Sequence, residues 1–530
     1  MKKFLPTTQM IVGLTVTLFT VLTGASLAAS TKNPPQVTTE NGRLQGITNA
    51  DRSVIVFKKV PYAAPPIGEL RWKPPRRAEN WTGVWRADKF GPACLQTEAF
   101  GNLHLRTEQS SEDCLFLNVW VPNRNTKTKF PVIVWLYGGG FVTGDSSEPR
   151  YDGGNLAKKG VIVVIPNYRL GVFGFFSHPD LTKESPNKAS GNYGLLDQVA
   201  ALEWVARNIA SFGGDPHNVT LAGQSAGSFS VSVLMASPLA QGLFQKAIGE
   251  SGGFYPPLNL LADAEKAGEE FVKSVGANSM EEMRKKSGAE LLQAAAKYKG
   301  GFGFDSILDG HVLPIDPITV YKEGRQSHIP LLAGWNADEG KMSFLSAPQK
   351  TTAKSFAGLA QSRFGGDAAE FLKFYPADSD ERARTSAEEL ADDDFSGFST
   401  WKWIEMHRKT GDSPAYEYHF EQVPAIGSGE SVGSKHSDEI EYVFQTLNSR
   451  EGVVWTAKDR QLSDMVSSYW VNFAKVGDPN FNGSPNWPKY SSADSFQVMH
   501  LSGRDMHASA DATRSRYEFL DSHALNPTTP

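Results

Sequence analysis

The chain has 530 residues, of which 40% are hydrophobic and 21% are charged, and its 53 basic and 58 acidic side chains give a formal net charge of −5. This is an ordinary globular composition, and without clustered Lys and Arg it gives no reason to expect nucleic acid as a partner. The two cysteines exclude a disulfide-rich scaffold and any metal site that needs four cysteines, which leaves one disulfide or two free thiols.

The first 28 residues differ in character from the rest of the chain. Lys2 and Lys3 form a basic start, an apolar run follows over residues 10–22, and small residues occupy positions 24–29. The apolar run of about 13 residues is shorter than the roughly 20 that a membrane-spanning helix needs. We therefore predict a signal peptide over residues 1–28, cleaved after Ala28, and export to the periplasm or the medium. An uncleaved membrane anchor is the alternative.

From residue 29 onward, short β-branched runs alternate with longer helical patterns. In chain order, strands are expected over 130–136 and 161–165, a helix over 195–211, a strand over 219–222, helices within 265–298, a strand over 329–335, helices within 354–389 and a strand over 415–423. This alternation predicts an α/β fold with a mostly parallel central sheet covered by helices. No linker is visible, so residues 29–530 are predicted to form a single catalytic domain, in which helical insertions cap the sheet.

A G-x-S-x-G motif, Gly223-Gln224-Ser225-Ala226-Gly227, lies between the strand over 219–222 and a helical stretch. A tight strand-to-helix turn strains the backbone of the serine, the glycines relieve the crowding around it, and the hydroxyl is left exposed. Ser225 is therefore a candidate nucleophile. The alternative is a glycine-rich turn in which the serine only caps the helix.

Three consecutive glycines follow the strand over 130–136, in Tyr137-Gly138-Gly139-Gly140-Phe141. Backbone N–H groups without neighbouring side chains can approach a substrate carbonyl and stabilise the negative charge that develops on its oxygen during acyl transfer. We predict an oxyanion hole formed by the amides of Gly139, Gly140 and Ala226. A phosphate-binding loop is the alternative, but neither a P-loop lysine motif nor a G-x-G-x-x-G opens a helix here.

A nucleophilic serine needs a histidine base that is oriented by a carboxylate, and in this kind of fold they follow in the order serine, acid, histidine. Asp338 and Glu339 are adjacent acid candidates in the loop after the strand over 329–335, and spacing does not choose between them. His436, in a Gly/Ser-rich loop, is the favoured base. His419 is its nearest rival, but it lies within the strand over 415–423, where a packed or surface histidine is expected.

These motifs, together with several longer segments, resemble the type-B carboxylesterase/lipase family of α/β-hydrolases, which includes bacterial esterases and cholinesterases. The resemblance covers nearly all of residues 29–530, and its clearest segments are 60–68, 70–72, 111–119, 167–171, 192–198, 212–216 and 487–490. It implies an α/β-hydrolase fold in which the helical insertions cap an active-site gorge. It also implies a triad of Ser225, Glu339 and His436, which settles the choice between Asp338 and Glu339.

Other positions take their expected roles from the same resemblance. It implies a disulfide between Cys94 and Cys114, a Ser251 that supports the acid, and scaffold ion pairs of Arg71 with Glu112 and Arg169 with Asp197. It places Phe141, Phe302 and Phe304 near the substrate pocket, and plain core packing is the alternative for the last two. The loop from Cys94 to Cys114 lacks the tryptophan with which cholinesterase-like members bind quaternary ammonium, so choline esters are disfavoured.

The predicted function is that of an exported serine carboxylesterase that needs no metal and no organic cofactor and acts on small-molecule esters of short or medium acyl length or with bulky aromatic groups. Alternatives are a lipase-like or bulky-ester hydrolase, or amide or thioester hydrolysis, with the same chemistry, and a non-catalytic binding protein of the same fold. Three adjacent carboxylates, Asp392, Asp393 and Asp394, are interpreted as a solvated helix start rather than a cation site. The sequence leaves the oligomeric state open.

Overall fold

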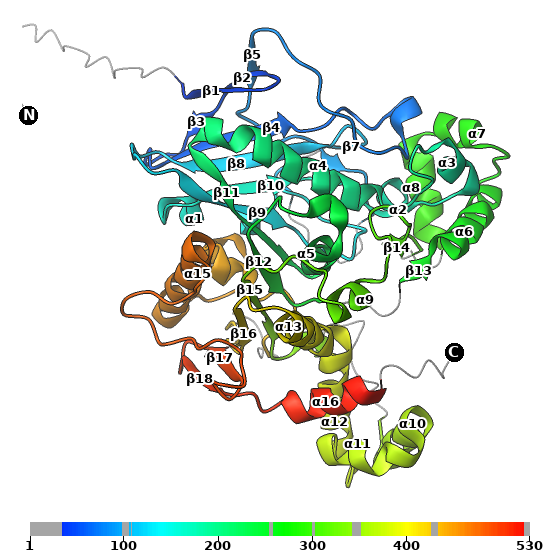
Figure 1. Cartoon of the computed structure of the whole chain (residues 1–530), viewed down its shortest axis with the longest axis vertical. Coiled ribbons are helices and arrows are strands. Elements are labelled where there is room, and N and C mark those ends of the chain that lie inside the picture. Colours follow the sequence, from blue (N-terminus) through cyan, green and yellow to red (C-terminus); the bar gives the residue numbers. More distant parts are fainter. Residues whose placement is uncertain are drawn as a thin grey trace, which may run out of the picture. The chain divides into compact units, whose positions relative to one another are not determined.

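An eleven-stranded sheet runs through the computed structural model, which describes residues 34–97, 105–107, 109–253, 258–298, 303–341, 351–425 and 433–523 (Figure 1). The strand order is β18-β17-β16-β15-β12-β11-β9-β10-β8-β4-β3. The strands are β3 (Ile47–Thr48), β4 (Val54–Pro61), β8 (Phe116–Pro122), β9 (Phe130–Leu136), β10 (Ile162–Pro166), β11 (Gly214–Gln224), β12 (Lys246–Glu250), β15 (Leu331–Asn336), β16 (Ala415–Phe420), β17 (Gln497–Leu501) and β18 (His507–Ala510).

The seven strands from β17 to β10 pair in parallel, and the pairs outside them are antiparallel. Every residue of β10, β12 and β15 is buried. Burial on both faces is why β10 and most of β15 consist of continuous apolar residues rather than an alternating pattern, whereas β12 carries Lys246 and Glu250 at its ends. The prediction of a mostly parallel α/β sheet is confirmed. The strand predicted over 219–222 is the end of a longer β11, and the strand predicted over 415–423 stops at Phe420.

Helices pack against this sheet and extend from it. Those in contact with its strands include α4 (Tyr193–Asn208), α5 (Ala226–Ala236), α13 (Phe398–Thr410) and α15 (Ala457–Val476). The predicted helical segments become two groups that lie apart in Figure 1: α6 (Leu261–Ser274), α7 (Met280–Lys285) and α8 (Gly288–Lys297), and α10 (Ala353–Phe364), α11 (Ala368–Phe374) and α12 (Asp380–Asp392). The remaining helices are α1 (Gly154–Lys158), α2 (Gly171–Phe175), α3 (Pro179–Glu184), α9 (Pro317–Lys322), α14 (Ile440–Val443) and α16 (Arg514–His523).

Small sheets and ion pairs complete the scaffold. The small sheets join β1 (Gln36–Thr39), β2 (Gly42–Gln45) and β5 (Val84–Arg86), β6 (Ala93–Cys94) and β7 (Ser110–Ser111), and β13 (Asn259–Leu260) and β14 (Ile307–Leu308). Arg71 binds Glu112 at 2.6 Å and Arg169 binds Asp197 at 2.7 Å, and all four side chains are largely buried. Buried pairs of this kind hold the loops they join in one arrangement, because breaking either pair would leave an uncompensated charge.

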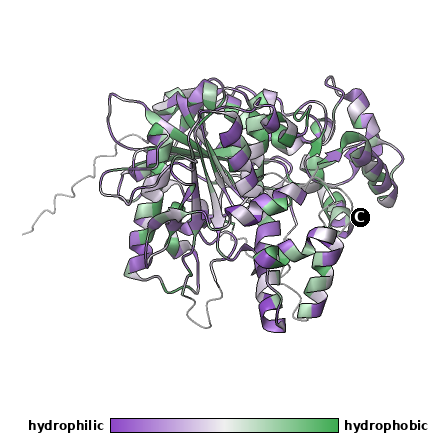
Figure 2. Ribbon diagram, turned by 60° about the horizontal axis from the view of Figure 1, so that its bottom comes forward, coloured by the Kyte–Doolittle hydropathy of each residue, from purple (hydrophilic) through white to green (hydrophobic). Residues whose placement is uncertain are grey.

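Residues 35–530 cluster as one compact unit. Figure 2 shows hydrophobic segments in the strands and hydrophilic segments on the outer helices. Within the described ranges, no helix is long and apolar enough to cross a membrane. The predicted signal peptide lies outside the described residues.

The expectation of a solvated acidic helix start at residues 392–394 is wrong. Asp392 ends α12, and Asp393 begins a π-helical segment, Asp393–Gly397, that leads into α13. Asp393 is buried and accepts hydrogen bonds from the hydroxyl groups of Tyr375, at 2.5 Å, and Tyr517, at 2.6 Å. Partners far along the chain supply these contacts, so the local sequence gave no sign of the burial.

Candidate active site

Ser225 occupies a sharp turn between β11 and α5. Its backbone has φ 55° and ψ −125°, a conformation that a side chain seldom adopts and that a nucleophile elbow requires. A Cβ on Gly223 would lie 2.5 Å from the backbone of Gly227, and a Cβ on Gly227 would lie 2.0 Å from the carbonyl oxygen of Leu136. Both glycines of the motif are therefore required by close backbone approach, as the sequence predicted.

The glycine-rich loop after β9 lies directly beside Ser225. A Cβ on Gly138 would come within 2.8 Å of the Ser225 Cβ, and Gly139, at φ +110°, could not carry one because it would lie 2.2 Å from the Thr143 carbonyl oxygen. The Gly139 carbonyl accepts hydrogen bonds from the amides of Val142 and Thr143, both at 3.1 Å, which fixes the turn. Among the described residues, none accepts a hydrogen bond from the amides of Gly139, Gly140 or Ala226.

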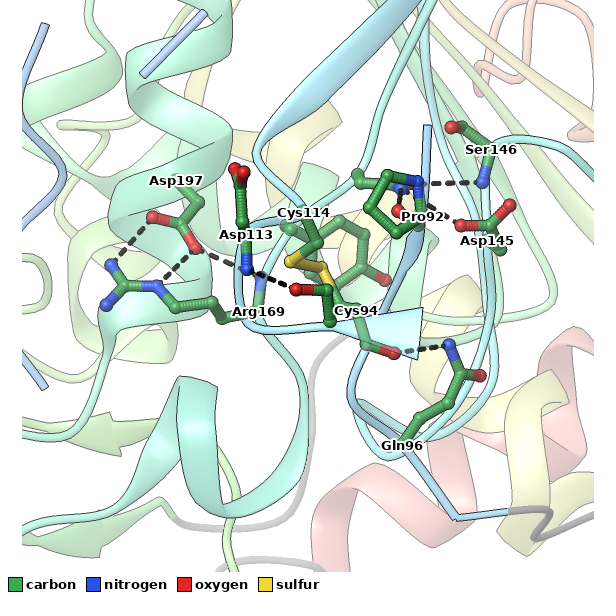
Figure 3. The surroundings of a disulfide bond; sticks show 12 residues. Pro92, Cys94, Gln96, Asp113, Cys114, Asp145, Ser146, Arg169 and Asp197 are labelled. Atoms are coloured by element: carbon green, nitrogen blue, oxygen red, sulfur yellow. Dashed lines mark hydrogen bonds and ion pairs between the residues drawn. A yellow bond between two sulfur atoms is a disulfide. The ribbon is translucent and has the colours of Figure 1, made fainter. Parts of the chain in front are cut away.

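A disulfide braces this loop from outside. Cys94 and Cys114 are joined, as the family resemblance implied, and Gln96 lies just beyond the bridge (Figure 3). The Gln96 side chain donates to the Cys94 carbonyl at 3.0 Å, and its amide oxygen accepts from the Thr143 hydroxyl at 2.7 Å and from the Gly144 amide at 2.8 Å. The disulfide loop thus holds the far side of the glycine turn, a role that the sequence analysis did not find for Gln96.

His436 and Glu339 meet although 97 positions separate them in the chain. The His436 Nδ1 lies 2.5 Å from the Glu339 Oε2, and the Glu339 Oε1 accepts the backbone N–H of Asn336 at 2.8 Å. The Glu339 side chain is completely buried and that of His436 is 8% exposed. Because a carboxylate can only accept, this contact assigns the imidazole proton to Nδ1 and leaves Nε2 as an acceptor.

The neighbouring carboxylate has a different task. The Asp338 Oδ2 accepts the backbone N–H of Ser434 at 2.7 Å, and the Asp338 N–H donates to the Ser434 carbonyl at 2.9 Å. Gly433, at φ +79°, leaves the space that the Asp338 carboxylate fills. Asp338 therefore holds the loop that carries His436, while Glu339 contacts the histidine itself.

The Nε2 of His436 faces the side-chain amide of Gln224, the residue before Ser225, at 3.2 Å. Since Nε2 is the acceptor, the amide donates this hydrogen bond. The ring of Phe395, in the π-helical segment, meets the imidazole edge to face at 4.8 Å between centroids. The sequence did not predict either Gln224 or Phe395 at this place. The position of Gln224 next to Ser225 in the G-x-S-x-G motif could have suggested its contact with the histidine.

Further acids lie buried beside the pair. Glu250 is the last residue of β12, directly before Ser251. Burial raises the pKa of Glu250 to about 8, although its Oε1 accepts the Trp470 indole N–H at 2.6 Å. Burial, followed by the charges of Glu250 and Glu339, raises the pKa of Glu439 well above its usual range. Asn336 joins these groups, because its side-chain amide donates to Glu439 and, at 2.7 Å, to the Lys435 carbonyl. Two buried acids whose pKa values lie above their usual range therefore lie near Glu339.

The other residues predicted for the site lie in different surroundings. Ser251 is buried at φ 55° with its N–H donated to the Gly334 carbonyl at 2.8 Å, but its hydroxyl has no hydrogen-bond partner among the described residues. Phe141 is buried against Phe175, with 5.0 Å between ring centroids. Phe304 packs among Phe176, Phe271 and Tyr298, as the core-packing alternative has it. Phe302 lies outside the described residues.

A parallel sheet with a strained serine between a strand and a helix defines the class of α/β-hydrolases. A family model described as the carboxylesterase family matches residues 33–520, so the chain belongs to that family. It is a carboxylic ester hydrolase, and the family's substrates are small-molecule esters.

Individual relatives are similar over almost their whole length. The chain is 36% identical over 506 residues to the fumonisin B1 esterase of Sphingopyxis macrogoltabida, covering 90% of this chain and 89% of that protein. It is 36% identical over 470 residues to the para-nitrobenzyl esterase of Bacillus subtilis, covering 86% and 92%. A solved PNB esterase structure superimposes with a TM-score of 0.81 at 33% identity and covers 94% of this chain and all of its own.

Proposed function

We propose that this protein hydrolyses carboxylic esters through an acyl-enzyme on Ser225. His436 takes the hydroxyl proton at Nε2, and the Ser225 oxygen attacks the carbonyl carbon of the ester. The tetrahedral intermediate collapses, the alcohol leaves with the proton that His436 returns to it, and the acyl group stays on Ser225. Water, deprotonated by the same nitrogen, then releases the carboxylic acid and restores the serine.

Glu339 has two tasks in this scheme. It holds the Nδ1 proton of His436, so that Nε2 stays free to accept a proton, and it stabilises the imidazolium that forms. The 2.5 Å contact between Glu339 and His436 is the observation that carries the proposal, since no structural need explains a histidine with one nitrogen on a buried carboxylate and the other facing Gln224, the neighbour of the serine.

The oxyanion is assigned to the amides of Gly139, Gly140 and Ala226. These donors make no hydrogen bond to the described residues, and the glycine loop lies against Ser225. Fixed backbone donors stabilise the developing charge without having to reorganise, and removal of one such donor typically lowers kcat by about 10²-fold to 10³-fold.

The favoured substrates are esters of short or medium acyl length. Helix α12, in one of the groups that extend from the sheet, is rich in charged residues, which does not favour a large apolar lid for long-chain lipids. One relative bears the name of a fumonisin B1 esterase, so a bulky alcohol is a second substrate type to be tested.

Rates on a series of p-nitrophenyl esters of increasing acyl length test this function, with the mature wild type beside Ser225→Ala. We expect wild-type hydrolysis with an optimum at short or medium chains and its loss in the variant. A variant that keeps wild-type rates overturns the assignment of Ser225, and an optimum at long chains overturns the substrate class. Ser228→Ala, one turn further along α5, is the matched control because its hydroxyl donates to the Gly252 carbonyl at 2.5 Å inside the core.

We also propose that the chain is exported and that residues 1–28 are removed after Ala28. The basic start, the short apolar run and the small residues at the cleavage position support this. Expression in a Gram-negative host, followed by fractionation and N-terminal sequencing, tests it. We expect the periplasmic or secreted protein to begin at Ala29, and a protein that keeps Met1 in the cytoplasm would contradict the proposal.

A further inference from the structure

A row of histidines crosses the strands at one edge of the large sheet. His419 on β16 pairs in register with His500 on β17, and His500 pairs with His507 on β18. Residues in register on neighbouring strands project from the same face and lie about 5 Å apart. The rings of His500 and His507 are stacked at 5.0 Å between centroids, and those of His419 and His500 stand at 84° to each other.

A carboxylate joins the first two histidines of this row. Glu421 follows His419 by two residues, and its backbone N–H donates to the Leu501 carbonyl at 3.0 Å, which continues the β16–β17 pairing past His419. Its Oε1 lies 2.6 Å from the His500 Nδ1 and 3.2 Å from the His419 Nδ1. One ligand atom from each of the three side chains lies within 4.8 Å of the other two.

We propose that His419, Glu421 and His500 form a binding site for a divalent transition-metal ion, with Zn²⁺ as the ion the donor set suits best. Two imidazole nitrogens and one carboxylate oxygen are a recognised zinc set that leaves the fourth position to water. Two donors on a tetrahedral zinc ion at about 2.1 Å lie about 3.4 Å from each other. The His419–Glu421 contact already has nearly this spacing, and the His500–Glu421 contact needs to open by less than about 1 Å.

The surroundings hold the ligands for this task. The second nitrogen of His500 lies 2.8 Å from the Ser509 hydroxyl on β18, a partner of the kind that orients ligating histidines. The indole of Trp335, in register on β15, stands edge to face against His419 at 5.8 Å between centroids. Each imidazole ring thus has a second neighbour besides the carboxylate.

The site is also open enough for an ion to enter. The side chains of His419, Glu421 and His500 are 25%, 36% and 21% exposed. This partial exposure separates the site from the fully buried Glu339, which already has a hydrogen-bond partner for each of its oxygens. Water completes the coordination sphere on the exposed side.

The ion acts as a clip on the fold and takes no part in ester cleavage. Glu421 and His500 are 79 residues apart, and the chain between them carries the His436 loop, α14 and α15. A metal that joins the two ends of so long a loop stabilises the folded chain, because ligands that are together only in the folded state bind the ion only there. The β17–β18 edge gains most, since it is attached to the sheet through β16 alone.

Equilibrium dialysis of the untagged, chelator-treated enzyme against Zn²⁺, with metal analysis by mass spectrometry, tests the site. We expect one Zn²⁺ per chain and a loss of affinity of at least about tenfold in His419→Ala, His500→Ala and Glu421→Gln. His523→Ala is the matched control, because His523 pairs with a single carboxylate, Asp367, at 3.2 Å and should leave Zn²⁺ binding intact. Mg²⁺, which prefers oxygen ligands, should not bind there.

A spectroscopic readout covers variants that fold poorly. Co²⁺ added to the wild type should give the visible absorption of a low-symmetry four-coordinate ion, and Zn²⁺ should abolish it and raise the melting temperature. Zn²⁺ that binds equally well to His419→Ala and to His500→Ala, or a wild type that binds none at micromolar concentrations, overturns the proposal and leaves a hydrogen-bonded cluster only. Ester hydrolysis does not enter either readout, so failure here is separate from failure of the proposed function.

Discussion

Two histidine–glutamate contacts in this protein have nearly the same length but differ in burial and in the number of histidines that share the glutamate. In each, a histidine Nδ1 lies 2.5–2.6 Å from a glutamate oxygen. Glu339 is completely buried, accepts one backbone N–H and serves one histidine, whereas Glu421 is 36% exposed and is shared by His419 and His500. The difference indicates that the burial and the other partners of a histidine–glutamate pair determine which chemistry the pair can support.

The other nitrogen of each histidine makes the point clear. The Nε2 of His436 faces Gln224, beside the strained Ser225, and that of His500 faces the Ser509 hydroxyl on an ordinary strand. Burial strengthens the electrostatic effect of a single carboxylate on a catalytic base, and partial exposure lets an ion and its water enter. The first pair is thus suited to proton transfer and the second to chelation.

The largest expected difference is between variants that lack a histidine from one contact or from the other. His436→Ala should lower kcat for p-nitrophenyl acetate by about 10⁴-fold or more, because no other group then takes the proton of Ser225. His419→Ala should change kcat by less than about tenfold, since its ring touches no residue of the proposed triad. A large loss in His419→Ala with His436→Ala still active would reverse the assignment.

The second largest expected effect on kcat distinguishes the two adjacent carboxylates, Glu339 and Asp338. Glu339→Gln should lower kcat by about 10⁴-fold with little change in KM, because an amide no longer fixes the Nδ1 proton or stabilises the imidazolium. Asp338→Asn keeps an acceptor for the Ser434 N–H, so its effect on kcat should be far smaller. Steady-state kinetics on both variants decide this, and equal losses would mean that Asp338 shares the role of the acid.

The raised pKa of the buried Glu250 predicts that the stability of the protein depends on pH. Burial raises the pKa of Glu250 to about 8, so the folded protein keeps a proton that the unfolded chain loses from about pH 4.5. The stability that this group contributes is complete below pH 4.5 and falls as the pH rises to 8. Glu250→Gln cannot ionise and keeps an acceptor for Trp470. Relative to the wild type, its free energy of unfolding should therefore rise by up to about 4 kcal/mol between pH 5 and pH 9.

Chemical denaturation at pH 5, 7 and 9 measures this gain. Glu388→Gln, a change at an exposed position of α12, supplies the control, and its difference from the wild type should stay constant with pH. A Glu250→Gln difference that is equally flat would show that Glu250 is ionised in the folded protein at pH 7.

The smallest expected effect concerns the second nitrogen of His436. Gln224→Ala removes one neutral hydrogen bond, worth about 1 kcal/mol, so kcat should change by no more than about tenfold. Steady-state kinetics with p-nitrophenyl acetate measure this change, and a loss of about 10³-fold or more would show that Gln224 does more than hold His436 in place.

Much of the fold was open to prediction because the signals are local. Continuous apolar runs marked β9, β10 and β15, and the G-x-S-x-G motif marked the turn that close backbone approach makes obligatory at Gly223 and Gly227. The boundaries of β11 and β16 were less accurate, since polar residues extend or end a strand according to what packs against it. Family resemblance added the choice of Glu339 over Asp338, which spacing alone could not make.

The rest depended on contacts between distant segments. Partners tens to hundreds of positions away create several features: the burial of Asp393, the raised pKa values of Glu250 and Glu439, and the contacts of Gln96 with the glycine loop. The histidine row depends on the register of the strands, because a slip of one residue would turn every side chain of a strand to the other face of the sheet. The sequence placed His419 within a strand as a packed or surface histidine, but its partners in β17 could not be seen from the sequence.

The most direct measurement is the mass of a trapped covalent intermediate. The mature wild type, mixed with a fluorophosphonate, should gain the mass of one phosphonyl group, and peptide mapping should place that group on Ser225; His436→Ala should react far more slowly. A modification on another residue, or full ester hydrolysis by a protein that never becomes labelled, would contradict the acyl-enzyme on Ser225.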